Sequence, residues 1–180
     1  MKKILEYAHE LLQSYVTKED ITVDMTAGNG HDTLFLAQIS KYVYAFDIQE
    51  EAIKNTNKLL QEHNITNVKL IHDSHIFVNK YVNESIGGAV FNLGYLPGSN
   101  KKIATNATTT IQAIQNILPL LKARGICVIV VYPGHSEGKI ESILVEEFAS
   151  KLNQQEYQVL KYQFINLRNN PPYIIAIMKK

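Results

Sequence analysis

The stretch that decides the fold runs from Ile21 to Ala37 and reads ITVDMTAGNGHDTLFLA. It opens with a short apolar run, Ile21–Met25, which is interrupted by Asp24, and it continues through a glycine-rich turn into a helical pattern. Strand, glycine turn and helix in this order are typical of the first nucleotide-binding unit of an open α/β sheet. Gly28 and Gly30 can take backbone angles closed to other residues, and we expect them to leave room for a ligand beside the main chain.

Two classes of ligand fit this unit, and a turn that binds nothing is a third interpretation. A dinucleotide fold needs a third glycine three positions after Gly30, where this chain has Thr33. It also holds a pyrophosphate over the helix N-terminus, where Asp32 would repel it. S-adenosylmethionine has no phosphate and carries a cationic sulfonium and an amino group, which Asp24 and Asp32 would attract. A glycine pair alone is a weak signal, so the choice depends on residues further along the chain.

Length and composition predict one globular domain, residues 1–180, with a helix preceding the first strand. The 180 residues are 46% hydrophobic and carry a formal net charge of +1, which suits a chain with a full core. This charge is not a nucleic-acid signature, although a local basic patch would still allow an RNA substrate. The single cysteine, Cys127, lies in an apolar run and is expected to be buried. No apolar run approaches membrane-spanning length, so no membrane partner is expected, and the lack of a disulfide framework fits the cytoplasm.

Strands and helices alternate through most of the chain. We expect strands at 21–25, 42–46, 68–71, 88–92, 125–131, 157–165 and 173–178, and helices at 3–15, 31–38, 50–62, 76–81, 104–118 and 139–152. The alternation predicts a mostly parallel seven-stranded sheet with helices on both faces. The connection 166–172 is too short for a crossover helix, so the last two strands should form an antiparallel hairpin. This α/β arrangement looks like the Rossmann-like methyltransferase fold. The helix at 3–15 should pack on the sheet edge or over the site.

Polar residues follow each of the first three expected strands, at the edge of the sheet where ligands bind. Asp47, after the second strand, can accept both ribose hydroxyls, and Asp73, after the third, can accept from an adenine amino group. Either acid alone could cap the next helix. Together with Asp24 and the glycine turn they indicate S-adenosylmethionine as the cofactor. The candidate cofactor-binding residues are Asp24, Gly28, Asn29, Gly30, His31, Asp32, Thr33, Asp47, Ile48, Asp73, Ser74, His75 and Asn92.

The fourth strand ends at Asn92 and continues into the loop Leu93-Gly94-Tyr95-Leu96-Pro97. Amine-directed methyltransferases often carry an Asn/Asp-Pro-Pro-aromatic segment here, whose carbonyl oxygens receive a substrate amine. This chain keeps the asparagine and the aromatic residue but lacks both middle prolines. A literal NPPY string at 170–173 lies too near the end of the chain to be that motif, and on its own it indicates a rigid turn. It would still begin at the same edge of the sheet and could touch substrate.

The segment Tyr132-Pro133-Gly134-His135 follows the fifth strand at this edge, and His135 is either a base, a substrate contact or a loop histidine without a role. No metal is expected, because no cysteine or acid cluster at ligand spacing accompanies His72 and His75. The candidate catalytic residues are Asn92, Tyr95, Asp32 and His135. The candidate substrate-binding residues are Tyr95, Pro97, Tyr132, His135, Asn170 and Pro171.

Four segments, VDMTAGNGHDTLFLA, NLGYLPG, YPGH and NNPPY, occur in this order and together resemble one small bacterial family. That family was long labelled an rRNA methylase and is now associated with methylation of the tRNA wobble uridine. The resemblance covers essentially the whole chain. It implies S-adenosylmethionine-dependent methylation of 5-aminomethyl-2-thiouridine in tRNA, which gives the 5-methylaminomethyl form. The alternatives are an rRNA or small-molecule amine methyltransferase and a non-catalytic nucleotide-binding module.

Two further expectations concern the proton and the assembly. The amine proton could pass to Asp32, His31 or His135, and the sequence leaves this choice open. A homodimer is expected because a symmetric pair would double the basic surface offered to a tRNA arm. The contact would involve the final hairpin or residues 118–124.

Overall fold

The computed structural model describes residues 1–93, 107–134 and 136–180. Tyr95, Pro97 and His135 therefore lie outside the described residues. The strands are β1 (Ile21–Asp24), β2 (Tyr42–Asp47), β3 (Val68–His72), β4 (Ile86–Asn92), β5 (Leu121–Val131), β6 (Tyr157–Tyr162) and β7 (Tyr173–Lys179). The helices are α1 (Ile4–Tyr15), α2 (His31–Ile39), α3 (Glu50–Glu62), α4 (Val78–Tyr81), α5 (Ala107–Ile117) and α6 (Ser136–Ser150), with short 3-10 turns η1 (His75–Phe77) and η2 (Leu118–Leu120).

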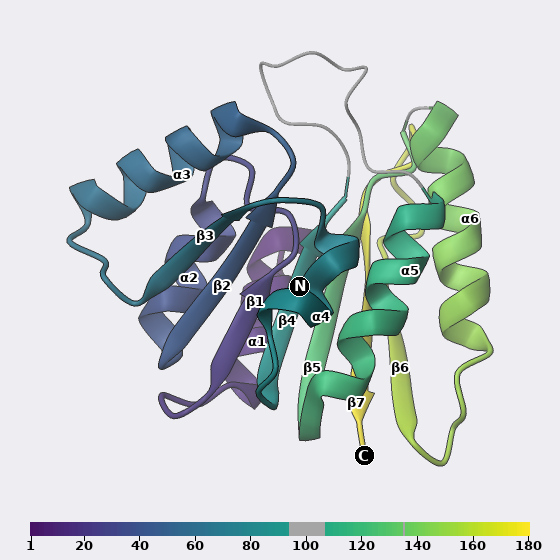
Figure 1. The fold of residues 1–180 in the computed structure, drawn as a ribbon. Coiled ribbons are helices and arrows are strands. Elements are labelled where there is room, and N and C mark those ends of the chain that lie inside the picture. The colour runs from purple at the N-terminus through teal and green to yellow at the C-terminus, as the bar shows by residue number, and fades with distance from the viewer. Residues whose placement is uncertain (94–106, 135) are drawn as a thin grey trace.

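The seven strands form one sheet in the order β3-β2-β1-β4-β5-β7-β6 (Figure 1). The strands β1 to β5 pair in parallel, whereas β7 pairs antiparallel with both β5 and β6. The mostly parallel sheet with a final antiparallel hairpin, expected from the sequence, is thus confirmed. The strand order reverses between β1 and β4, and a ligand site is expected outside the carboxyl ends of the strands at such a point.

Two strand boundaries differ from the sequence prediction by more than two residues. β5 begins at Leu121 rather than at residue 125, because it contains a bulge: its register with β4 shifts between Ile86 and Gly88. Arg124 takes a left-handed conformation (φ 63°) in that bulge, so the polar residues 122–124 belong to the strand although they read as a turn. β6 ends at Tyr162 rather than at 165, because its partner β7 begins only at Tyr173.

Helices cover both faces of the sheet. Figure 1 shows α4, α5 and α6 in front of the sheet and α1 behind it. The front core includes Ala113, Ile114 and Ile117 of α5, whereas the rear core joins α1 and α2 to the strands. α1 packs on the sheet face rather than on its edge. The Tyr162 hydroxyl, at the end of β6, donates to the Lys2 carbonyl, so the start of α1 lies near that end of β6.

The carboxyl ends of the parallel strands meet at one rim, and the last hairpin adds its loop to that rim. Val131, at the end of β5, lies opposite Tyr173, and Tyr162 lies opposite Ile174. Residues 163–172 therefore leave the sheet on the same side as the glycine turn. Among the described helices, none is long and apolar enough to cross a membrane.

Candidate active site

The glycine turn has the left-handed backbone that the sequence predicts, and at Gly30 it also packs closely against α3. Gly28 and Gly30 have positive φ values of 54° and 86°. A Cβ on Gly30 would stand 2.9 Å from the Cα of Thr56 in α3 and 3.0 Å from its side-chain atoms. The space beside the Gly30 Cα in the Cβ direction is therefore filled by α3, and contact of the Gly28 and Gly30 main chain with a ligand stays a prediction. The Thr56 hydroxyl also donates a hydrogen bond to the Gly28 carbonyl (3.2 Å), so α3 stabilises the turn.

Asp24 lies buried at the end of β1 and accepts hydrogen bonds from residues on both sides of the glycine turn. One carboxylate oxygen accepts the Thr26 amide (3.0 Å), and the other accepts the Thr33 hydroxyl at the start of α2 (2.6 Å). Burial, with the charge of Asp32 as a second cause, raises the pKa of Asp24 from 3.8 to about 7. These bonds fix the strand-to-helix geometry. A direct contact between Asp24 and the cofactor stays a prediction.

Asp47 connects the glycine turn to the end of β2. Its two oxygens accept the amides of Gly28 and Gln49, each at 2.9 Å. Ile48, the next residue, leaves 53% of its surface exposed although it is apolar. A partly exposed carboxylate beside an exposed aliphatic side chain suits a ribose and the face of an adenine.

The segment after β3 contributes an ionised acid and a neutral histidine. Asp73 accepts the Tyr81 hydroxyl at 2.7 Å, and this bond lowers the pKa of Asp73. His75 donates from Nδ1 to the Met25 carbonyl (3.0 Å), and burial lowers its pKa. Its Nε2 atom is buried and has no hydrogen-bond partner among the described residues. His75 thus keeps a buried acceptor that no described residue uses, while Ser74 caps the turn η1.

Asn92, Asp32 and His9 form a chain of hydrogen bonds across the end of the sheet. The Asn92 side-chain amide donates to one oxygen of Asp32 (3.1 Å), and His9 Nε2 lies 2.7 Å from the other oxygen. The Asn92 backbone amide donates to the Thr26 hydroxyl at 2.7 Å, which ties β4 to the segment after β1. The predicted catalytic residues Asn92 and Asp32 are therefore in contact.

Three further predicted site residues, Asn29, His31 and Tyr132, are not part of this chain of hydrogen bonds. Asn29 accepts the Asn55 side-chain amide (3.1 Å), and the neighbouring His31 is exposed at the first turn of α2. Tyr132 is partly buried, and burial together with the charge of Asp32 raises the pKa of its hydroxyl. Tyr132 therefore stands on the Asp32 side of the site.

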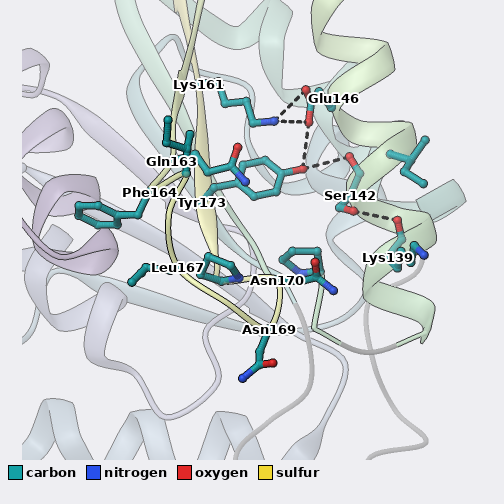
Figure 2. A pocket seen from close by; sticks show the side chains of 14 residues that line it. Lys139, Ser142, Glu146, Lys161, Gln163, Phe164, Leu167, Asn169, Asn170 and Tyr173 are labelled. Carbon is teal, nitrogen blue, oxygen red and sulfur yellow. Dashed lines mark hydrogen bonds and ion pairs between the residues drawn. The ribbon is translucent and has the colours of Figure 1, made fainter.

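Asn170 and Pro171 line a groove of about 580 Å³ beyond β5 and β7 (Figure 2). The groove lies between α6 and the loop 163–172. Lys161 pairs with Glu146 on one wall (2.8 Å), and the Tyr173 hydroxyl donates to the Ser142 carbonyl (3.2 Å). These two predicted substrate residues thus belong to the groove beside α6, and neither is hydrogen-bonded to Asn92 or Asp32 among the contacts of the described residues.

Four contributors to the site were missed by reasoning from sequence: His9, Thr26, Thr56 and Tyr81. Thr26 and Tyr81 lie within a few residues of predicted positions, so a search for hydroxyl donors beside each strand-end acid would have found them. His9 and Thr56 come from helices whose position on the sheet is set by tertiary packing. No spacing in the sequence relates them to Asp32 or Gly30.

The described residues fit S-adenosylmethionine better than a pyrophosphate cofactor. Asp24, Asp32 and Asp47 are close enough for the charges of the other two to raise the pKa of Asp24. Such a field attracts the cationic sulfonium and amino groups and repels phosphate. Among the described residues, no group of histidine, cysteine and acid side chains could hold a metal ion.

A Rossmann-like sheet with an antiparallel final strand and acids at the ends of β1, β2 and β3 defines the class of S-adenosylmethionine-dependent methyltransferases. Comparison with known proteins agrees. The chain belongs to the family described as "Putative rRNA methylase", which matches residues 43–178. It is 36% identical, over 99% of its length and 70% of the relative's, to a protein of Arabidopsis thaliana named "tRNA (mnm(5)s(2)U34)-methyltransferase, chloroplastic".

Solved structures show the same relationship. A "putative methyltransferase" of Streptococcus mutans, crystallised in complex with SAH, superposes with a TM-score of 0.95 at 42% identity and covers 100% of this chain and 99% of its own. A "putative rRNA-methylase" of Clostridium thermocellum gives a TM-score of 0.98 at 38% identity, covering 100% of this chain and 99% of its own. The protein is therefore an S-adenosylmethionine-dependent methyltransferase.

Proposed function

We propose that this enzyme methylates the exocyclic amine of 5-aminomethyl-2-thiouridine at the wobble position of tRNA, giving 5-methylaminomethyl-2-thiouridine. The observation that carries the proposal is the 36% identity, over nearly the whole chain, to the Arabidopsis protein whose name states this product. The family description mentions rRNA instead, so rRNA is the substrate that a test must exclude. The proposal also assigns the enzyme to the cytoplasm, as a tRNA-modifying protein.

The chemistry requires a neutral amine held in line with a methyl donor. S-adenosylmethionine supplies an electrophilic methyl group, and the protein chiefly aligns the amine with it. A primary amine with a pKa of ~10.4 is neutral in only about one molecule per thousand at pH 7. An acceptor that bonds the amine therefore helps twice, by orienting its lone pair and by receiving its proton. The Asn92 amide oxygen is the proposed orienting group, and the Asp32 carboxylate is the proposed proton acceptor.

The proposed substrate-binding residues would extend the site from this centre along the rim. Tyr132 would contact the base from the end of β5, with Asn170 and Pro171 further along the rim. Tyr95, Pro97 and His135 keep their predicted roles, since an unstacked RNA base commonly lies against an aromatic ring. Lys139, which lines the groove, would meet the RNA backbone.

Nucleoside analysis of tRNA from cells that lack this protein tests the proposal. We expect 5-aminomethyl-2-thiouridine to accumulate and its methylated form to disappear. The wild-type gene should restore the product, whereas Asn92→Ala should not, because the variant loses the group that orients the amine. An unchanged tRNA nucleoside profile, with a methyl group missing from rRNA, would refute the substrate assignment and leave the methyltransferase class intact.

We also propose a homodimer formed through the final hairpin and α6. Seven large apolar side chains there are at least 38% exposed: Ile140, Ile143, Leu144, Val159, Leu160, Ile165 and Leu167. Exposed apolar groups gathered beside an edge strand are typical of a protein–protein contact. Leu118 and Leu121, in the other candidate region, are buried. Light scattering at micromolar concentration should give twice the chain mass, and Ile143→Glu with Ile165→Glu should give a monomer. A wild-type monomer would end this proposal.

A further inference from the structure

His9 of α1 contacts the proposed catalytic pair although it lies far from it in the sequence. Its Nε2 atom stands 2.7 Å from Asp32, and its ring stacks on Phe35 of α2 with centroids 3.9 Å apart and planes 4° apart. The Asp32 side chain is only 13% exposed and that of His9 is 31% exposed. A hydrogen bond at this depth is shielded from water, so it orients its partner more strictly than a surface bond would.

The chemistry of the three groups fixes which atom donates. An ionised carboxylate only accepts hydrogen bonds, so both neighbours of Asp32 must donate to it. His9 therefore carries a proton on Nε2, and Asn92 turns its NH₂ end toward Asp32. The oxygen end of the Asn92 amide consequently faces away from Asp32. An amide oxygen, unlike the NH₂ end, can accept a hydrogen bond from a substrate amine.

Asp32 needs a second donor to hold this orientation. Its charge acts on two neighbours, since it contributes to the raised pKa values of Asp24 and Tyr132. Neither group is hydrogen-bonded to Asp32 among the contacts of the described residues, whereas His9 and Asn92 are. Without the His9 bond, one Asp32 oxygen would lose its partner and the carboxylate could rotate away from Asn92.

We infer that His9 is a positioning residue for methyl transfer, acting through Asp32 to set the amide of Asn92 with its oxygen toward the substrate amine. The inference rests on the proposed function, because it assumes an amine nucleophile at Asn92. It assigns α1 a part in catalysis, because this helix brings a hydrogen-bond donor to the Asp32 oxygen that Asn92 does not contact. His9 itself is not among the predicted cofactor contacts, and replacing it leaves the charge of Asp32 in place, so cofactor affinity should change little.

Two substitutions separate the hydrogen bond from the ring packing. His9→Gln keeps an N–H donor at about the position of Nε2 but loses the ring. His9→Phe keeps a ring that can stack on Phe35 but donates nothing. If His9 only packs α1 against α2, His9→Gln is the damaged variant and His9→Phe is active. If His9 positions Asp32, the order is reversed.

The experiment measures kcat and KM of purified wild-type and variant enzyme on tRNA carrying the aminomethyl uridine. We expect His9→Phe to lower kcat about tenfold or more, the scale of a lost hydrogen bond to a charged group, with both KM values within about threefold of wild type. His9→Gln should retain kcat within about threefold. Binding of S-adenosylhomocysteine by calorimetry and the melting temperature of His9→Phe serve as controls for folding.

A double-mutant cycle with Asn92→Ala completes the test. Since His9 acts through Asn92, His9→Phe should cause no further loss in kcat in the Asn92→Ala background. Equal kcat for His9→Phe and wild type, slow turnover of both His9 variants, or additive losses with Asn92→Ala would each overturn the inference. Failure of the wild-type enzyme on this tRNA would instead refute the proposed function. The comparison of variants would then be made on whichever amine or RNA the wild type methylates.

Discussion

Replacing Gly30 by alanine adds one methyl group at the point where the glycine turn meets α3. Gly30 has φ 86°, and a left-handed backbone costs a non-glycine residue about 1–2 kcal/mol. The new Cβ would also stand 2.9 Å from the Cα of Thr56, a backbone atom that cannot rotate away. Overpacking of this kind costs about 1–3 kcal/mol. We expect the free energy of unfolding to fall by about 3 kcal/mol.

Urea denaturation measures this loss directly, and thermal melting should show a decrease of about 6–12 °C for a chain of this size. Gly134→Ala is the matched control, because its Cβ would meet its nearest atom, the Asn170 carbonyl oxygen, at 3.9 Å, an ordinary contact. The control should change the free energy of unfolding by less than about 0.5 kcal/mol. If Gly30→Ala is as stable as this control, the turn does not press on α3 and the account of Gly30 is wrong.

Three further predictions concern the strand-end acids. Asp47→Ala should weaken binding of S-adenosylhomocysteine by about 1.5–3 kcal/mol in calorimetry, since it removes a charged acceptor; unchanged affinity would take Asp47 out of the site. Thr33→Val should lower the free energy of unfolding in urea by about 1–2 kcal/mol, because buried Asp24 loses a donor, and no loss would contradict that bond. The pKa of Asp24 rises on folding from 3.8 to about 7, so its contribution to stability is full below 3.8 and is lost as the pH rises through 7. The stability of wild type relative to Asp24→Asn, measured in urea from pH 5 to pH 8, should therefore fall with pH, and a constant difference would show that the pKa is not raised.

The architecture could be predicted because it depends on short-range patterns. Alternating strands and helices define a parallel sheet, and the short connection before Tyr173 forces the last strand to reverse. The start of β5 was misjudged because Lys122 and Arg124 are polar and the bulge that contains them depends on pairing with β4. A bulge is a property of two strands, so one strand's sequence does not reveal it.

The site was predictable where its residues follow strand ends and unpredictable where helices reach it from elsewhere. Asp32 and Asn92 were both singled out, and they are hydrogen-bonded to each other. The sequence pattern also singled out Gly30, but the close packing of Thr56 against it could not be predicted, because that contact depends on where α3 lies. His9 was missed because its contact with Asp32 exists only once α1 and α2 pack on the same face of the sheet.

The most direct measurement of the central claim is methyl transfer by the purified enzyme from isotopically labelled S-adenosylmethionine. The acceptors are tRNA with 5-aminomethyl-2-thiouridine at the wobble position, the same tRNA with unmodified uridine there, and rRNA. The label should appear only with the first acceptor, in a single nucleoside with the mass of 5-methylaminomethyl-2-thiouridine. Label in rRNA with the modified tRNA unlabelled, or label in the tRNA that lacks the aminomethyl group, would contradict the assignment of the amine as nucleophile.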